Sequence, residues 1–131
     1  MWPFLLLLGF LITRKGREIL KLSESIKSSS VFKQVYHGGR SYANLYLIMY
    51  VLKNGTSTNR IGISVSKKVG NSVVRHRITR LIRESYRLNE DMFNSGLDIV
   101  VIARVGAKDK GYHEINSALL HLAKMHKIIK L

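Results

Sequence analysis

The sequence contains no cysteine among its 131 residues. This absence excludes disulfide bonds, a thiolate nucleophile and any zinc site built with cysteine, and it is typical of a reducing compartment. Acidic residues are also scarce, because eight Asp and Glu stand against 22 Lys and Arg, which gives a formal net charge of +14. Such an imbalance increases self-repulsion within a small fold and favours a polyanionic partner, either nucleic acid or an anionic membrane.

The few acids are scattered along the chain, and only Glu90 and Asp91 are adjacent. Nucleases that use two metal ions need several carboxylates that converge on ions about 4 Å apart. The five histidines include no His-x-x-x-His pair that could share a helix face. The sequence therefore predicts no catalytic residue and no metal ligand in the protein. A nuclease whose histidines meet only through the fold stays open as an alternative.

The apolar run at the N-terminus, Trp2–Ile12, is too short to span a bilayer, which takes roughly 20 residues. Positive charges follow this run, whereas a secretory signal carries them before it. It could be a weak membrane anchor, a segment packed on the domain or an extension outside the functional fold. We favour the last, with an extension over residues 1–20 and one domain over residues 21–131. Apolar residues make up 46% of the chain, enough for the core of one domain.

The hydrophobic pattern predicts an α+β domain with elements in the order α-β-β-α-β-α, in which helices pack against one central sheet. The predicted elements are a helix capped by Ser28–Ser30 and stopped at Gly38–Gly39, strands over 42–52 and 60–66, a helix over 71–88, a strand over 97–104 and a helix over 112–127. In the first strand, the predicted core face carries Ala43, Leu45, Leu47, Met49 and Val51. Its opposite face carries Tyr42, Asn44, Tyr46, Ile48 and Tyr50.

The helix over 71–88 combines an apolar stripe with a basic one. At 100° per residue, the stripe predicted to face the sheet holds Val74, Ile78, Leu81, Ser85 and Leu88. Solvated helix faces usually mix charges, yet Glu84 is the only acid from Ile61 to Asn89. A solvated face stays the alternative, but arginine-rich stripes suit forked hydrogen bonding to phosphate. The residues predicted to bind RNA are Lys67, Lys68, Asn71, Arg75, His76, Arg77, Arg80, Arg83 and Arg87.

Four other residues form a candidate aromatic surface. Phe32 and Tyr36 lie four residues apart on one face of the first helix, and Ile48 and Tyr50 alternate with the core positions of the first strand. Aromatic side chains favour strands in any case, so this face could be core beneath the helix. It could also be a platform on which single-stranded bases stack. The core interpretation and the stacking interpretation can both be correct if the four residues line a cleft.

Four stretches of the chain resemble the ribonuclease P protein family, and together they cover most of the sequence from Leu20 onward. They are Val31–Tyr36 with Gly39–Asn44, Arg60–Asn71, Val74–Ile78 with Arg80–Glu84, and Asp98–Arg104.

The chain departs from the family pattern in two places. His76 stands where the family has Asn in an Arg-Asn-Arg motif, and Thr79 stands where a basic residue is frequent. The first change removes the hydrogen bonds of the Asn, although His still donates to phosphate.

The resemblance implies the protein subunit of an RNA enzyme, in which a catalytic RNA with Mg²⁺ removes the 5′ leader from precursor tRNA. It implies that Arg75, His76, Arg77, Arg80 and Arg83 contact RNA, and that Phe32, Tyr36, Ile48 and Tyr50 line a cleft for the leader. It further implies a left-handed β-α-β crossover, a cytoplasmic location, Mg²⁺ held mainly by RNA, no organic cofactor and no stable membrane partner. Two alternatives are a ribosomal or chaperone-type RNA-binding protein, and a protein of the membrane surface.

Overall fold

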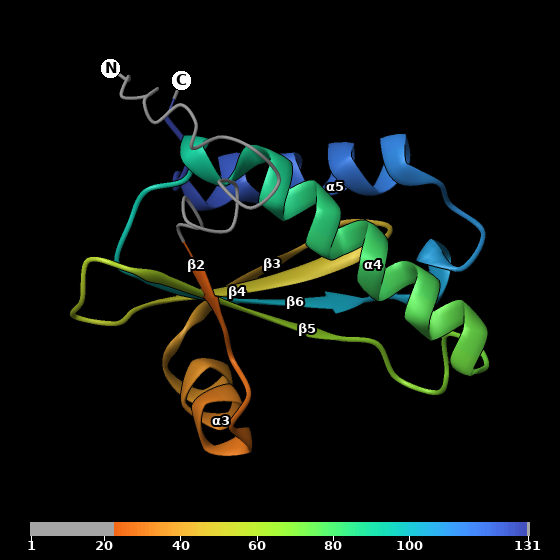
Figure 1. Ribbon diagram of the computed structural model, residues 1–131, viewed down its shortest axis with the longest axis horizontal. Coiled ribbons are helices and arrows are strands. Elements are labelled where there is room, and N and C mark those ends of the chain that lie inside the picture. Colours follow the sequence, from red (N-terminus) through yellow and green to blue (C-terminus); the bar gives the residue numbers. More distant parts are fainter. Residues whose placement is uncertain (1–22, 131) are drawn as a thin grey trace, which may run out of the picture.

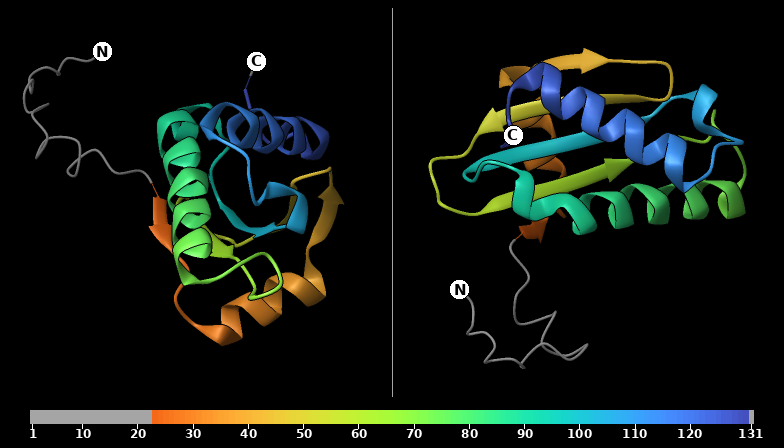
Figure 2. Two further views of the ribbon diagram at one scale, coloured as in Figure 1. Left: turned by 90° about the vertical axis from the view of Figure 1, so that its right-hand side faces the viewer. Right: turned by 90° about the horizontal axis from the view of Figure 1, so that it is seen from above.

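The computed structural model describes residues 23–130 of the chain, and the predicted N-terminal extension lies outside them. The elements are β2 (Ser23–Ser25), α3 (Ser29–Gly38), β3 (Arg40–Ala43), β4 (Leu47–Lys53), β5 (Asn59–Ser64), α4 (Ser72–Asn89), η1 (Glu90–Met92), β6 (Leu97–Ala103), η2 (Val105–Ala107) and α5 (Tyr112–His126). The strands form one sheet in the order β2-β5-β6-β4-β3. Helices α4 and α5 cover one face of the sheet and α3 covers the other (Figures 1 and 2). The α+β prediction is confirmed.

The crossover from β5 through α4 to β6 has the unusual hand that the family resemblance implies. Strands β5 and β6 are neighbours and run parallel. Seen from the side of α4 with both strands pointing up, β6 lies to the left of β5 (Figure 2, right). The crossover is therefore left-handed, whereas about 98% of such connections are right-handed.

The larger part of the core lies between the sheet and the helices α4 and α5. Its fully buried side chains include Leu47, Met49, Ile78, Ile82, Ile99, Val101, Ile115, Leu119 and Leu122. A smaller cluster lies on the α3 side, where Ile26, Val35 and Val100 are buried. Because helices cover both faces, the central strand β6 is apolar on both sides, which explains its Ile-Val-Val-Ile run.

Local signals set the ends of α3 as predicted. The Ser28 hydroxyl caps the helix by accepting from the Ser30 amide at 3.1 Å. At the other end, the Gly39 amide donates to the Val35 carbonyl at 2.8 Å. A Cβ atom at Gly39 would stand 2.6 Å from that carbonyl oxygen, so the close approach requires glycine here.

The prediction of one strand over 42–52 is wrong, because the chain turns within it. The Asn44 Oδ1 accepts from the amides of Tyr46 and Leu47 at 3.2 and 3.0 Å and so builds a tight turn between β3 and β4. As a result Leu45 is 77% exposed instead of buried. Tyr42 pairs with Met49 and packs against the main core, on the face opposite to the predicted one.

Two further predictions need correction. The order α-β-β-α-β-α misses β2, a three-residue strand that pairs in parallel with β5. On α4, Leu88 is 56% exposed, whereas Ile82 and Tyr86 are buried. Tyr86 can face inward because its hydroxyl forms a hydrogen bond with Ser23 Oγ at 2.7 Å, while its ring packs edge-on against Phe93. The buried face of α4 is therefore rotated from the predicted one.

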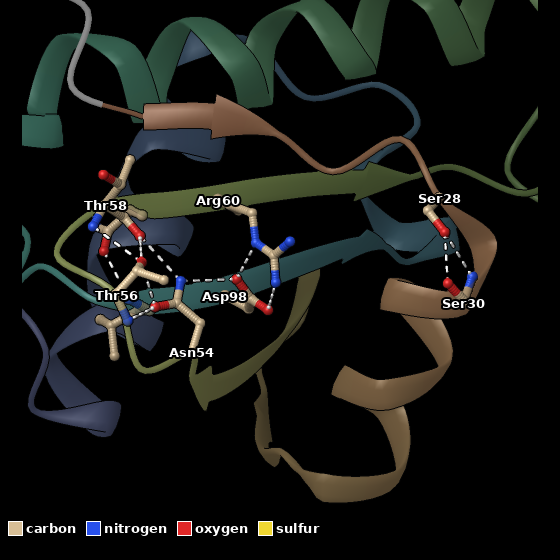
Figure 3. Close-up of polar contacts among 9 residues, drawn as sticks. Ser28, Ser30, Asn54, Thr56, Thr58, Arg60 and Asp98 are labelled. Atoms are coloured by element: carbon tan, nitrogen blue, oxygen red, sulfur yellow. Dashed lines mark hydrogen bonds and ion pairs between the residues drawn. The ribbon is translucent and has the colours of Figure 1, made fainter.

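A buried carboxylate joins three segments on the α3 face of the sheet. The two carboxylate oxygens of Asp98 each accept from the Arg60 guanidinium at 2.7 Å, and one also accepts from Asn54 at 3.0 Å (Figure 3). Burial alone would raise the pKa of Asp98, but the hydrogen bonds from Arg60 and Asn54 and the charge of Arg60 outweigh it. The pKa therefore lies below its ordinary value of 3.8.

We expect Asp98→Asn to lower the free energy of unfolding by about 1–3 kcal/mol at pH 7, because a bidentate charge-assisted contact in a buried position is lost. A carboxyl with a lowered folded pKa stabilises the fold above its unfolded pKa, and this stabilisation is lost as pH falls through the folded pKa. Urea unfolding of both proteins should therefore show the difference at pH 7 and a smaller one below about pH 4.

Glu84→Gln is the matched control, because Glu84 pairs with Arg87 at 2.8 Å while both side chains are nearly half exposed. This exposed pair should contribute no more than about 0.5 kcal/mol. Equal costs for the two variants, or a cost at Asp98 that does not change with pH, would contradict the assigned role of Asp98.

Candidate nucleic-acid interface

The predicted RNA-binding residues begin in the connection that leads into α4. Lys67 and Lys68 are exposed there, and the connection lies on the same side of the sheet as α3 (Figures 1 and 2). Asn71 caps the helix, because its Oδ1 accepts from the Val74 amide at 3.0 Å. The structure therefore gives Asn71 a helix-capping role at the position predicted to contact RNA.

Three basic side chains project freely from the outer face of α4. His76, Arg80 and Arg83 are exposed, and within residues 23–130 their side chains take part in no hydrogen bond or ion pair. Arginine side chains on a solvated helix usually find acidic partners three or four residues away. Here the guanidinium donors of Arg80 and Arg83 face solvent and can bind phosphate oxygens in the forked geometry.

The other three arginines of the predicted set are engaged differently. Arg75 is half-buried, and its Nε donor is buried without a hydrogen-bond partner among the described residues. Arg77 is half-buried and donates to the main-chain carbonyls of Lys108 and Lys110. Arg87 is exposed but donates to Glu84. The predicted set therefore divides. Within residues 23–130, Arg80 and Arg83 have no partner, Arg77 and Arg87 donate to acceptors of the protein, and the buried Nε of Arg75 stays unpaired.

Thr79, one of the two departures from the family pattern, lies between these groups. Its hydroxyl donates to the Arg75 carbonyl at 2.9 Å, within the helix. The side chain is half-buried. Thr79 therefore adds no donor to the outer face, and the basic face of α4 depends on His76, Arg80 and Arg83.

The predicted aromatic residues gather on the α3 side of the sheet. The ring of Tyr36 meets that of Tyr50 edge-on with centroids 5.1 Å apart, and the ring of Phe32 lies 6.2 Å from that of Tyr36. Phe32, Ile48 and Tyr50 are half-buried, whereas Tyr36 is 37% exposed. Partial burial raises the pKa of the Tyr36 hydroxyl above its ordinary value, while a hydrogen bond with Ser64 acts in the opposite direction.

A glycine in β5 sets how closely α3 approaches the sheet. A Cβ atom at Gly62 would lie only 2.7 Å from the end of the Phe32 ring. The ring therefore rests on bare backbone. Phe32 and Tyr50 pack against the small cluster on this side, and Tyr36 lies at its edge. Phe32, Tyr36 and Tyr50 thus form one aromatic surface, of which Phe32 and Tyr50 are partly core and Tyr36 is the most accessible ring. Ile48 is half-buried two residues before Tyr50 in β4, and it belongs to neither core cluster.

The fold brings to α4 a basic segment that the sequence did not single out. Residues 104–110 contain Arg104, Lys108 and Lys110, and the segment meets the first turns of α4 through Arg77. Only its three basic residues within seven positions could have drawn attention to it. The contact with α4 spans more than 30 residues of sequence, so no local pattern reveals it.

The sequence and the fold of this chain match those of known proteins. The sequence model of the ribonuclease P family matches residues 20–127. The chain belongs to the ribonuclease P protein family. It is 69% identical over 108 residues to the ribonuclease P protein component of Lachnoclostridium phytofermentans, an alignment that covers 82% of this chain and 93% of the relative.

Solved ribonuclease P proteins have the same fold. The protein of Staphylococcus aureus is 38% identical, with a TM-score of 0.77 over 82% of this chain and 99% of that one. The protein of Thermotoga maritima is 30% identical, with a TM-score of 0.72 over 78% and 96% of the two chains. These matches do not favour the alternative of a ribosomal or chaperone-type protein. Within residues 23–130, no helix has the length and apolar character needed to cross a membrane.

Proposed function

We propose that this protein binds the catalytic RNA of ribonuclease P and helps it to remove the 5′ leader from precursor tRNA in the cytoplasm. The observation that carries the proposal is the free basic face of α4, on which His76, Arg80 and Arg83 project without partners among residues 23–130. A protein of this family is a subunit of a ribonucleoprotein endoribonuclease, so the phosphates of its RNA are the natural partner of this face.

The aromatic surface of Phe32, Tyr36 and Tyr50, together with Ile48, is proposed to hold the single-stranded leader. Aromatic rings bind unpaired bases by stacking, which tolerates any base sequence. Tyr36 offers an accessible ring, and Tyr50 supports it from β4. The connection between β5 and α4 lies on the same side of the sheet as α3 (Figure 2), and its exposed Lys67 and Lys68 can bind the phosphates between the stacked bases.

Mg²⁺ is proposed to be held by the RNA, where it supplies the charge needed to activate water and stabilise the leaving oxygen. The protein residues do not fit this ion, because within residues 23–130 no three Asp, Glu or His side chains lie together as metal ligands would. The contribution proposed for the protein is binding, in which its fixed cations reduce the repulsion between RNA phosphates.

We expect the protein to restore cleavage of precursor tRNA by a bacterial ribonuclease P RNA at a Mg²⁺ concentration too low for the RNA alone. Fixed positive charges beside the RNA replace part of the screening that Mg²⁺ otherwise provides. The measurement is the rate of leader removal across a Mg²⁺ titration, with and without the protein. Rigorously RNA-free protein is the control, and specific leader removal by it would overturn the proposed division of roles.

A further inference from the structure

Arg77 lies on the RNA-binding helix, yet its guanidinium is turned toward the protein. Its Nη1 donates to the Lys110 carbonyl at 2.9 Å, and its Nη2 donates to the Lys108 carbonyl. A guanidinium has five donors in a rigid fork, and this fork spans two carbonyls that lie two residues apart. The side chain is half-buried. Arg77 therefore has fewer donors left for phosphate than Arg80 and Arg83, which have no partner within residues 23–130.

Arg77 donates hydrogen bonds to the end of the segment over residues 104–110. The start and the centre of this segment are held by other contacts. The Arg104 amide donates to the Tyr46 carbonyl at 2.8 Å, and the Arg104 guanidinium donates to the Asn44 carbonyl at 2.7 Å. Ala107 is fully buried in the main core. The segment is thus anchored at its start by Arg104 and at its centre by Ala107, and Arg77 is the side chain that holds its end.

This anchored segment presents positive charge beside α4. It carries Arg104, Lys108 and Lys110 against a single acid, Asp109. Lys108 is exposed, and Lys110 is half-buried with its ammonium 5.4 Å from the centre of the Tyr46 ring. A segment with this charge, held against a helix that bears free arginines, extends the positive surface beyond the helix.

We propose that Arg77 is a positioning residue, which holds residues 104–110 against α4 so that Lys108 and Lys110 extend its RNA-binding face. Their partner is the phosphate backbone of the RNA that α4 binds, so the inference rests on the proposed function. It differs from the role that the family resemblance implies for Arg77, which is direct contact with RNA. The two roles need different properties of the side chain. Direct contact with a phosphate needs only a positive charge, whereas holding the carbonyls of Lys108 and Lys110 needs the two-nitrogen geometry of a guanidinium.

The test uses Arg77→Lys, Arg77→Ala and the double variant Lys108→Ala/Lys110→Ala in complex with a bacterial ribonuclease P RNA. Lysine keeps the charge but lacks the rigid fork whose two nitrogens reach the two carbonyls, so a positioning role predicts equal losses of RNA affinity for Arg77→Lys and Arg77→Ala. The double variant leaves the carbonyls in place, and it should reduce the slope of log affinity against log salt by about 1.4–1.8. Adding Arg77→Ala to the double variant should then cost less than twofold more, since a positioning residue acts through the side chains already removed.

A second measurement does not involve RNA. Amide hydrogen exchange of residues 104–110 in the free protein should accelerate by about tenfold or more in both Arg77 variants, because the local opening becomes easier. Exchange within α5 should stay as in the wild type, which distinguishes release of the segment from general unfolding. If Arg77→Ala does not fold, Arg77→Lys and the lysine double variant still decide the question.

Normal RNA binding by Arg77→Lys together with a loss in Arg77→Ala would overturn the inference and return Arg77 to a direct phosphate contact. Additive losses for Arg77→Ala and the lysine double variant would overturn it too, as would unchanged hydrogen exchange. Failure of the proposed function looks different, because the wild-type protein itself would then not bind the RNA. Hydrogen exchange would in that case still report whether Arg77 holds the segment.

Discussion

Replacing Arg80 and Arg83 together with alanine should weaken binding to a bacterial ribonuclease P RNA by roughly 25- to 60-fold at 0.1 M salt. Each lost phosphate contact removes about 0.7–0.9 from the slope of log affinity against log salt, so the double variant should lose about 1.4–1.8. Both side chains are exposed and lie off the buried face of α4, so the fold should keep its stability. Filter binding at several salt concentrations and a thermal melt provide the measurements.

Lys124→Ala is the matched control for the charge lost at each arginine. Lys124 is an exposed residue near the end of α5, away from the start of α4 (Figure 1). Its replacement should leave the salt slope almost unchanged, because nonspecific attraction to the net charge of the protein accounts for little of it. Equal effects of Lys124→Ala and of the single arginine variants would mean that α4 has no special role and that its basic stripe is a solvated face.

The elements that the sequence predicted correctly have local causes. A capping serine and a closing glycine bound α3, and Asn71 caps α4 three residues before the predicted apolar stripe starts at Val74. The unbroken apolar run of β6 reports burial on both faces, and the spacing of Ile115, Leu119 and Leu122 identifies the buried side of α5. In each case the residues that set the structure are close together in the sequence.

The errors have tertiary causes. The turn contains no glycine or proline, and Asn44 is its one turn-forming residue. Asn44 stands where the alternation of the predicted strand expects a polar residue, so the reversal was missed. The side chain of Asn44 is also held by a distant residue, because its Nδ2 donates to the Ala118 carbonyl on α5 at 3.0 Å. Strand β2 consists of Ser23, Glu24 and Ser25, which have no strand preference, and it forms because the edge of β5 is available.

In the candidate site, too, the correct predictions have local causes and the errors have tertiary ones. Residue types and helical spacing placed Arg80 and Arg83 on an outer face, and the structure confirms this position. Arg77 was included in the same set of predicted RNA contacts, although its guanidinium donates to carbonyls of residues 108 and 110, which no local pattern links to it. The sequence could therefore predict which side chains leave the core, but not which of their donors the protein itself uses.

Tyr36→Ala should weaken binding of precursor tRNA to the assembled enzyme by about 1–3 kcal/mol, the contribution of one stacked base. Mature tRNA lacks the leader, so its affinity should hardly change. Tyr36 is the right position for this test because it is 37% exposed at the edge of the small cluster, whereas Tyr50 packs within it. The loss of an accessible ring should cost the fold little, and the melting temperature should fall by only a few degrees.

Two control variants separate stacking from packing. Tyr36→Phe keeps the ring and should bind both tRNAs like the wild type. Val35→Ala truncates the neighbouring side chain, which is fully buried, and should destabilise the fold by about 2 kcal/mol. Any binding lost in that variant reflects unfolded protein and affects precursor and mature tRNA alike. If Tyr36→Ala instead behaves like Val35→Ala, with a large drop in melting temperature and equal losses for the two tRNAs, the aromatic surface is structure and the leader binds elsewhere.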